Sequence, residues 1–143
     1  MGTFGEYLEI KVLDLIWGST GFVPSTKIYF GLTSATLTST GEEYSGAEPS
    51  TATGYARVYV GNTSANFIGA ETSGTVAVKY NSTSITFPTV ANSSWPTVNY
   101  AFCTNASCSS GYLLCWGALT TPKSLAVGDT ASFSSGAFKI TLD

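Results

Sequence analysis

The three cysteines are the side chains of this chain best suited to chemistry, and they lie together in the stretch CTNASCSSGYLLC at positions 103, 108 and 115. Their spacing is C-x4-C-x6-C. A structural zinc site takes four thiolate or imidazole ligands, commonly from paired C-x2–4-C motifs. This chain has three thiols and no histidine. The spacing therefore argues against a metal site, and we predict no metal and no cofactor.

Two of the cysteines, Cys103 and Cys108, flank a short loop and are candidates for a disulfide. Such a bond forms when the two Cα atoms come within about 7 Å, and the odd number of cysteines then leaves one thiol over. A reducing cytosol keeps thiols reduced, whereas a particle released from the cell can oxidise later. The alternative is that all three side chains simply pack, because cysteine is among the most buried residue types.

Residues for catalysis are scarce. The absence of histidine removes Ser-His-Asp and Cys-His arrangements and every imidazole general base. A thiol nucleophile would lack its usual base. No pair of carboxylates stands in an apolar context that would separate the two pKa values, as an acid/base pair requires. We therefore predict that the protein is not an enzyme and has no catalytic residues.

The charge content is low for a free monomer: 10% of residues are charged and the net charge is −3, against roughly 25% charged residues in typical soluble domains. A surface rich in neutral Ser and Thr favours a protein that packs against neighbours. The few basic residues are scattered, so no cluster is available to neutralise phosphates and we predict no nucleic-acid partner. They are Lys11, Lys27, Arg57, Lys79, Lys123 and Lys139.

The N-terminal segment lacks the features of a secretory signal, which needs a basic start and an uninterrupted apolar core. Glu6, Glu9 and Asp14 interrupt its apolar residues. No run approaches the roughly 18 apolar residues of a membrane span. We expect synthesis in the cytoplasm without a signal peptide, and no membrane partner.

Residues 1–18 are predicted to form an amphipathic helix. Thr3 followed by Glu6 matches a capping box, and Gly18 predicts the end of the helix. The apolar residues fall on one helical stripe, and such a stripe at a chain terminus often marks an interface. We predict that it docks the subunit, either on a neighbour or on its own sheet. The candidate assembly interface is Phe4, Leu8, Val12, Leu15 and Trp17.

Residues 19–143 are predicted to form the body of the same single domain, an all-β antiparallel sandwich of the jelly-roll type. After Pro24 the apolar residues alternate with a period of two, and Gly, Pro, Asn and Ser clusters separate the runs. No second helical pattern follows, which argues against βαβ units. The predicted strands are TKIYFGL, YARVYV, TVAVKY, SITF, TVNYAFC, YLLCW, TASF and AFKITL.

Three acids, Glu42, Glu43 and Glu48, lie in the longest irregular segment. The simpler interpretation is a solvated loop. The functional one is a contact arm or a cation site, although the spacing lacks the alternating Asp/Asn ligands of a calcium loop.

Among the aromatic residues, Trp95 beside Pro96 is the candidate for an exposed ligand contact. Tyr100, Tyr112 and Trp116 fall on the faces of predicted strands, where core packing is the common fate. An exposed tryptophan would suit a sugar platform, so a carbohydrate-binding module for host-surface attachment is one functional alternative.

Several stretches resemble a family of small tailed-bacteriophage virion proteins, usually labelled tail fibre or minor tail proteins. The resemblance covers nearly the whole chain and is strongest near the C-terminus, where Pro122 and Lys123 predict a turn and Gly128-Asp129 a hairpin turn. The loop CTNASCSSGY departs from the short polar or Gly-rich loop of that family. Its cysteines are therefore interpreted as a feature of this chain and not of the family. The resembling stretches are FGEYLEIKVLDLIWGST, IYFGLTSA, EPSTATGYARV, ITFPTV, SWPTVNYAF and LLCWGALTTPKSLAVGDTASFSSGAFKITLD.

The resemblance implies a non-enzymatic structural protein of the virion, acting through contacts with other virion proteins and with copies of itself, for example as a trimer. It supplies no catalytic residues. A capsid cement or decoration protein that stabilises the phage head is the main alternative, and the carbohydrate-binding module, with a host-surface glycan as partner, is the other.

Overall fold

The computed structural model describes residues 3–18, 21–37, 47–73, 76–107 and 111–142. Its principal sheet has five strands in the order β1-β8-β7-β2-β3, and all neighbouring pairs are antiparallel. These strands are β1 (Thr3–Phe4), β8 (Leu113–Leu125), β7 (Trp95–Thr104), β2 (Lys27–Thr33) and β3 (Val58–Gly61).

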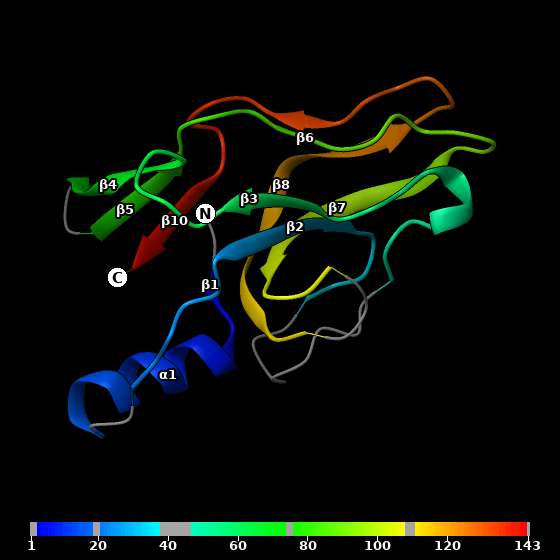
Figure 1. Cartoon of the computed structure of the whole chain (residues 1–143). Coiled ribbons are helices and arrows are strands. Elements are labelled where there is room, and N and C mark those ends of the chain that lie inside the picture. Colours follow the sequence, from blue (N-terminus) through cyan, green and yellow to red (C-terminus); the bar gives the residue numbers. More distant parts are fainter. Residues whose placement is uncertain (1–2, 19–20, 38–46, 74–75, 108–110, 143) are drawn as a thin grey trace.

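Two smaller sheets lie against the principal one (Figure 1). The first has the order β10-β5-β4 and the second pairs β6 with β9, again antiparallel throughout. The predicted antiparallel all-β sandwich is therefore confirmed. The strands are β10 (Lys139–Leu142), β5 (Val76–Asn81), β4 (Phe67–Ser73), β6 (Ile85–Thr86) and β9 (Ser132–Phe133), and one 3-10 turn, η1, spans Thr51–Thr53.

The main core lies between these layers, where apolar side chains from alternate strand positions meet. Burying them removes apolar surface from water, which contributes about 25 cal/mol per Å². A smaller cluster of Leu37, Phe102 and Leu113 lies apart from it. The main core comprises Phe30, Leu32, Tyr55, Phe67, Ile85, Phe87, Val90, Trp95, Val98, Ala101, Cys103, Cys115 and Leu125.

The N-terminal helix α1 (Glu6–Trp17) is present, but it begins later than predicted. Thr3 and Phe4 form β1, which pairs with β8 in the register Phe4↔Cys115. Gly5 is the N-cap and has extended backbone angles, so the Thr3–Glu6 capping box is wrong. The tertiary contact decides this start, because the Gly5 N–H donates to the Leu114 carbonyl at 2.9 Å. The predicted stop at Gly18 is confirmed, since Gly18 is the C-cap.

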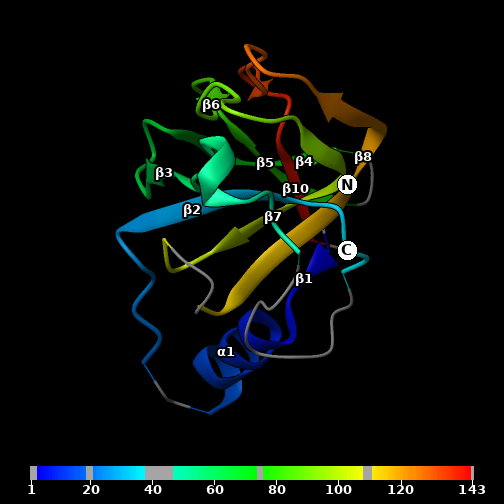
Figure 2. The same cartoon turned by 90° about the vertical axis from the view of Figure 1, so that its right-hand side faces the viewer.

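Helix α1 projects from one end of the sandwich in both views (Figures 1 and 2). No α1 side chain is fully buried. The ring of Tyr7 stacks on Tyr112, the residue before β8, with centroids 4.0 Å apart and planes 5° from parallel. The first turns of the helix are thus attached to the body, while its distal end extends away from it.

Strand β8 differs from its prediction because it continues through Pro122 and Lys123, where a turn was expected. The pairing shifts from Tyr100↔Ala118 to Val98↔Lys123, so β8 carries several extra residues opposite Asn99. Pro122 lies in this bulge, where a residue without an N–H costs no ladder hydrogen bond.

Candidate functional site

The cysteines of β7 and β8 face each other. Cys103 and Cys115 are Cα partners in the antiparallel ladder; both are free thiols, 1% and 4% exposed. Burial raises the pKa of the Cys103 thiol well above its usual range, and a hydrogen bond with the Cys115 thiol adds to the rise. Cys108, the other half of the predicted Cys103–Cys108 disulfide, lies outside the described residues, so that pairing stays a prediction.

An apolar cavity of about 210 Å³ lies beside the two thiols, open to solvent on one side. Its walls come from β1, α1 and both sheet layers, so it lies where the helix joins the sandwich. Besides Cys103 and Cys115, it is lined by Phe4, Leu8, Ile28, Asn62, Phe67, Lys79, Leu114 and Ile140.

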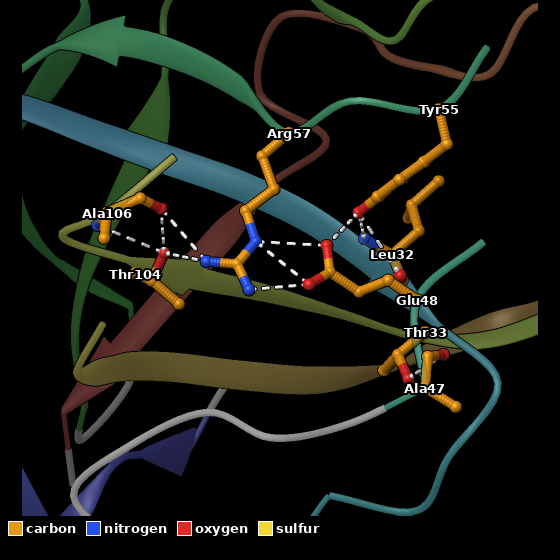
Figure 3. A network of polar contacts seen from close by, with 8 residues as sticks. All are labelled: Leu32, Thr33, Ala47, Glu48, Tyr55, Arg57, Thr104 and Ala106. Carbon is orange, nitrogen blue, oxygen red and sulfur yellow. Dashed lines mark hydrogen bonds and ion pairs between the residues drawn. The ribbon is translucent and has the colours of Figure 1, made fainter. Parts of the chain in front are cut away.

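A second notable feature is a buried ion pair between Arg57 and Glu48, shown in Figure 3. Arg57 Nη2 lies 2.6 Å from Glu48 Oε1, and the two side chains are 1% and 15% exposed. The Arg57 Nε–H donates to both carboxylate oxygens, at 3.1 and 3.0 Å. On its other side, Nη1 donates to the Thr104 hydroxyl and the Ala106 carbonyl, each at 3.0 Å. Arg57 thus ties the segment at Glu48 to the end of β7.

Tyr55 extends the same network into the core. Its hydroxyl donates to Glu48 Oε2 at 2.7 Å and accepts from the Leu32 N–H at 2.9 Å. Burial, followed by the nearby Glu48 charge, raises the pKa of Tyr55 far above its usual value. The solvated-loop interpretation is therefore wrong for Glu48, whose carboxylate is engaged by Arg57 and Tyr55. Glu42 and Glu43 lie outside the described residues.

Trp95 is not an exposed ligand contact. It is 3% exposed, its indole N–H donates to the Thr53 carbonyl at 3.1 Å, and its ring meets Tyr55 edge-on with centroids 5.2 Å apart. The prediction was wrong because the neighbouring Pro96 is exposed and successive residues of a strand point to opposite faces, so Trp95 points into the core. A sugar platform at this residue is therefore excluded.

The residues of the predicted assembly interface fall into two groups. Phe4 lies in β1 and packs against the core, while Leu8 and Val12 are partly buried. Leu15 and Trp17 are 53% and 76% exposed. Docking of this set on a partner stays a prediction.

A row of α1 residues that shares only Trp17 with the predicted interface faces outward. Ile10, Leu13 and Trp17 are 39%, 56% and 76% exposed, at spacings of i, i+3 and i+7 that place them on one helical face. Ile16, 60% exposed, lies beside them. We call Ile10, Leu13, Ile16 and Trp17 the outer face of α1. Spacing of this kind is the pattern by which helices bind apolar grooves of partners.

A groove of about 580 Å³ opens beside the bulge of β8. Two hydroxyl pairs lie near it, Thr97–Ser124 and Thr89–Thr130, each at 2.8 Å. A turn forms at Gly128-Asp129, where Gly128 has φ 95° and an Asp129 carboxylate oxygen accepts from the Ala126 N–H at 2.9 Å. The predicted turn is confirmed, but it is not a hairpin turn, because β8 pairs with β1 and β7 while the next strand, β9, pairs with β6. The lining is Leu32, Val98, Leu119, Thr120, Thr121, Lys123, Ser124, Leu125, Asp129, Thr130, Ala131, Ser132 and Phe133.

Within the described residues, no three Cys, Asp or Glu side chains gather as ligands of a metal ion. Among those same residues, α1 is the longest helix at 12 residues, and no helix is long and apolar enough to cross a membrane.

The profile of a protein family described as "Podophage GP4 fiber I protein gp80" matches residues 3–141 of the chain. The chain belongs to this phage fibre family. A search of curated proteins found no match. Membership makes the chain a structural fibre protein of the virion, associated with other virion proteins. It also confirms the resemblance that the sequence motifs carried.

The Arg57–Glu48–Tyr55 network of this fibre protein was not predicted from the sequence. Its members lie in irregular backbone on either side of η1, before β3 begins at Val58, and their spacing is not one that periodicity can detect. The one available signal was compositional: Arg57 is the single charged residue of the predicted strand YARVYV, whose other residues are apolar or aromatic. Charged residues are almost never fully buried unless they are paired.

Proposed function

We propose that this fibre protein is a non-enzymatic subunit that joins the particle by inserting the outer face of α1 into an apolar groove of a neighbouring virion protein. The observation that carries the proposal is the exposure of Trp17 at 76%, Ile16 at 60% and Leu13 at 56% on one short helix. Large apolar side chains in one patch are uncommon on a free soluble surface and commonly mark an interface.

The position of the helix supports the same function. The first turns of α1 are attached to the body by the Tyr7–Tyr112 stack and by the hydrogen bond from Gly5 to Leu114, so the position of the outer face is set before docking. Little ordering of the subunit is then required on docking, which lowers the cost of association. Tryptophan at the end of the row suits an anchor, because tryptophan is enriched among the residues that dominate binding energy.

The acids of α1 suggest the chemistry of the partner's groove. Glu6 and Glu9 are exposed and lie near the first turn, at the base of the outer face. A basic rim at the matching end of the groove would complement them, and such complementarity adds specificity and speeds association. The proposed occupant of the interface is therefore a neighbouring virion protein with an apolar groove that is basic at one end.

The test is a substitution on the outer face with a matched control elsewhere. Leu13→Glu combined with Trp17→Glu removes two anchors while leaving the packed side of α1 intact. Val127→Glu is the control, because Val127 is also exposed, at 57%, but lies in the turn after β8. We expect the double variant to fold with wild-type circular dichroism yet to be lost from purified virions, and Val127→Glu to be incorporated normally. Normal incorporation of the double variant would refute docking by this face.

A further inference from the structure

The buried residues Cys103 and Cys115 lie at a separation that a disulfide can span. Directly opposite residues in an antiparallel ladder have Cα atoms about 4.5–5.5 Å apart, and disulfides span Cα separations of 4.4–6.8 Å. Cys103 and Cys115 are such a pair, and their thiols are within hydrogen-bonding reach of each other. Bond formation therefore requires side-chain rotation and little backbone movement.

Small molecules have a route to this pair. Both cysteines line the apolar cavity at the junction of β1, α1 and the sheets, and the cavity is open on one side. Its volume of about 210 Å³ exceeds that of a water-sized oxidant several-fold, since one water occupies about 30 Å³ in the liquid. With 4% exposure, Cys115 is the more accessible of the two thiols.

We propose that Cys103 and Cys115 are an oxidation site of the subunit, and that a hydroperoxide converts them to a cross-strand disulfide. In the first step the Cys115 sulfur takes one oxygen from hydrogen peroxide, which gives a sulfenic acid and releases water. In the second step the Cys103 sulfur attacks the sulfenic sulfur. The S–S bond forms, and the hydroxyl leaves with the Cys103 proton as a second water. Two thiols are oxidised and one peroxide is reduced to two waters.

The bond would join β7 to β8 next to β1, the strand that leads into α1. Cys115 is the register partner of Phe4 in β1, and Phe4 and Leu8 line the same cavity. Oxidation thus changes the surface against which β1 and the first turns of α1 pack. The reaction is expected to be slow at neutral pH, because the buried Cys103 holds its proton and the thiolate is the reactive form.

The experiment treats the purified full chain with hydrogen peroxide, blocks remaining thiols with N-ethylmaleimide, and maps disulfides by mass spectrometry of non-reduced digests. Cys108→Ser is the informative variant, because it removes the competing thiol and leaves both members of the pair. We expect a Cys103–Cys115 peptide in the wild type and in Cys108→Ser. We also expect faster formation at pH 9 than at pH 7, and a Tm about 5 °C higher after oxidation.

Two results would overturn the proposal. One is a wild-type disulfide that joins Cys108 to either partner and excludes the Cys103–Cys115 bond. The other is a Cys108→Ser protein in which both thiols remain available to N-ethylmaleimide after denaturation, despite peroxide at concentrations that oxidise Cys108 in the wild type. Because these readouts do not involve the virion, they are independent of docking by the outer face of α1.

Discussion

Replacing Glu48 by Gln removes the charge that balances Arg57 while preserving the shape of the side chain. Glu48 accepts hydrogen bonds from the Arg57 Nη2 and Nε groups and from the Tyr55 hydroxyl. The Arg57 side chain is 1% exposed, so the substitution leaves a buried guanidinium without its counter-charge. The neutral acceptors Thr104 and Ala106 and the ring of Phe102, whose centroid is 5.1 Å from Arg57 Cζ, supply no counter-charge.

The magnitude follows from the cost of an uncompensated buried charge. Breaking a buried ion pair by removing one partner costs about 3–5 kcal/mol. Gln retains one oxygen as an acceptor, and the Glu48 side chain is 15% exposed, so the lower part of that range applies. We expect Glu48→Gln to lower the free energy of unfolding by about 3 kcal/mol. For a chain of this size that corresponds to a Tm decrease of roughly 5–10 °C.

The assay is urea unfolding monitored by tryptophan fluorescence, with Glu71→Gln as the control because Glu71 is an exposed acid of β4. A double-mutant cycle with Arg57→Met isolates the interaction. The double variant should be more stable than the sum of the two single effects predicts, by about 2 kcal/mol, since it leaves no buried charge unpaired. The reasoning is refuted if Glu48→Gln stays within about 0.5 kcal/mol of the Glu71→Gln control.

Two further predictions concern the core and the helix start. The raised pKa of Tyr55 means that the folded state keeps this proton when the unfolded chain releases it. The free energy of unfolding should therefore fall as pH rises above about 10, by up to 1.36 kcal/mol per pH unit. Urea titrations at pH 9 to 11 should show a smaller pH dependence for Tyr55→Phe than for the wild type. An equal pH dependence for the two proteins would contradict this. Gly5→Ala should destabilise by about 2 kcal/mol, because an added Cβ would lie 2.1 Å from the Leu113 carbonyl oxygen. The Tm of Gly5→Ala is compared with that of the control Gly21→Ala, whose added Cβ would meet nothing within 4 Å. An equal Tm for the two variants would show that the backbone relaxes around the Gly5 contact.

The sandwich was predictable because the alternation of apolar residues is a local property of each strand. Val58 and Val60, for example, pack toward the core while Tyr59 is 56% exposed. The helix was predictable because the spacing of its apolar residues is also a local property, and its end at Gly18 was predictable because glycine is common at helix ends. Period-two reasoning failed where the register shifts. Val98 and Phe102, expected on one face of β7, lie in different clusters, because the pairing of β7 with β8 is irregular between Val98 and Tyr100.

The candidate sites were harder to predict because they depend on contacts between distant residues. The helix start at Gly5 is set by Leu114, and Trp95 is buried by Thr53 and Tyr55. Cys115, not part of the predicted disulfide, is the register partner of Cys103. Propensity and spacing describe neighbours in the chain, so they could not indicate these pairs. Of the outer face of α1, only Trp17 was part of the predicted interface. Which side of the helix faces the body depends on the packing of Leu8 and Tyr7, which the spacing of the apolar residues does not give.

The central claim, that the outer face of α1 holds this fibre protein in the particle, is tested most directly by cryo-electron microscopy of intact virions at side-chain resolution. We expect the subunit at the tail, with Leu13, Ile16 and Trp17 buried in an apolar groove of a neighbouring virion protein. A reconstruction in which α1 extends into solvent while another surface makes the contact would contradict it, as would a subunit bound to the capsid shell.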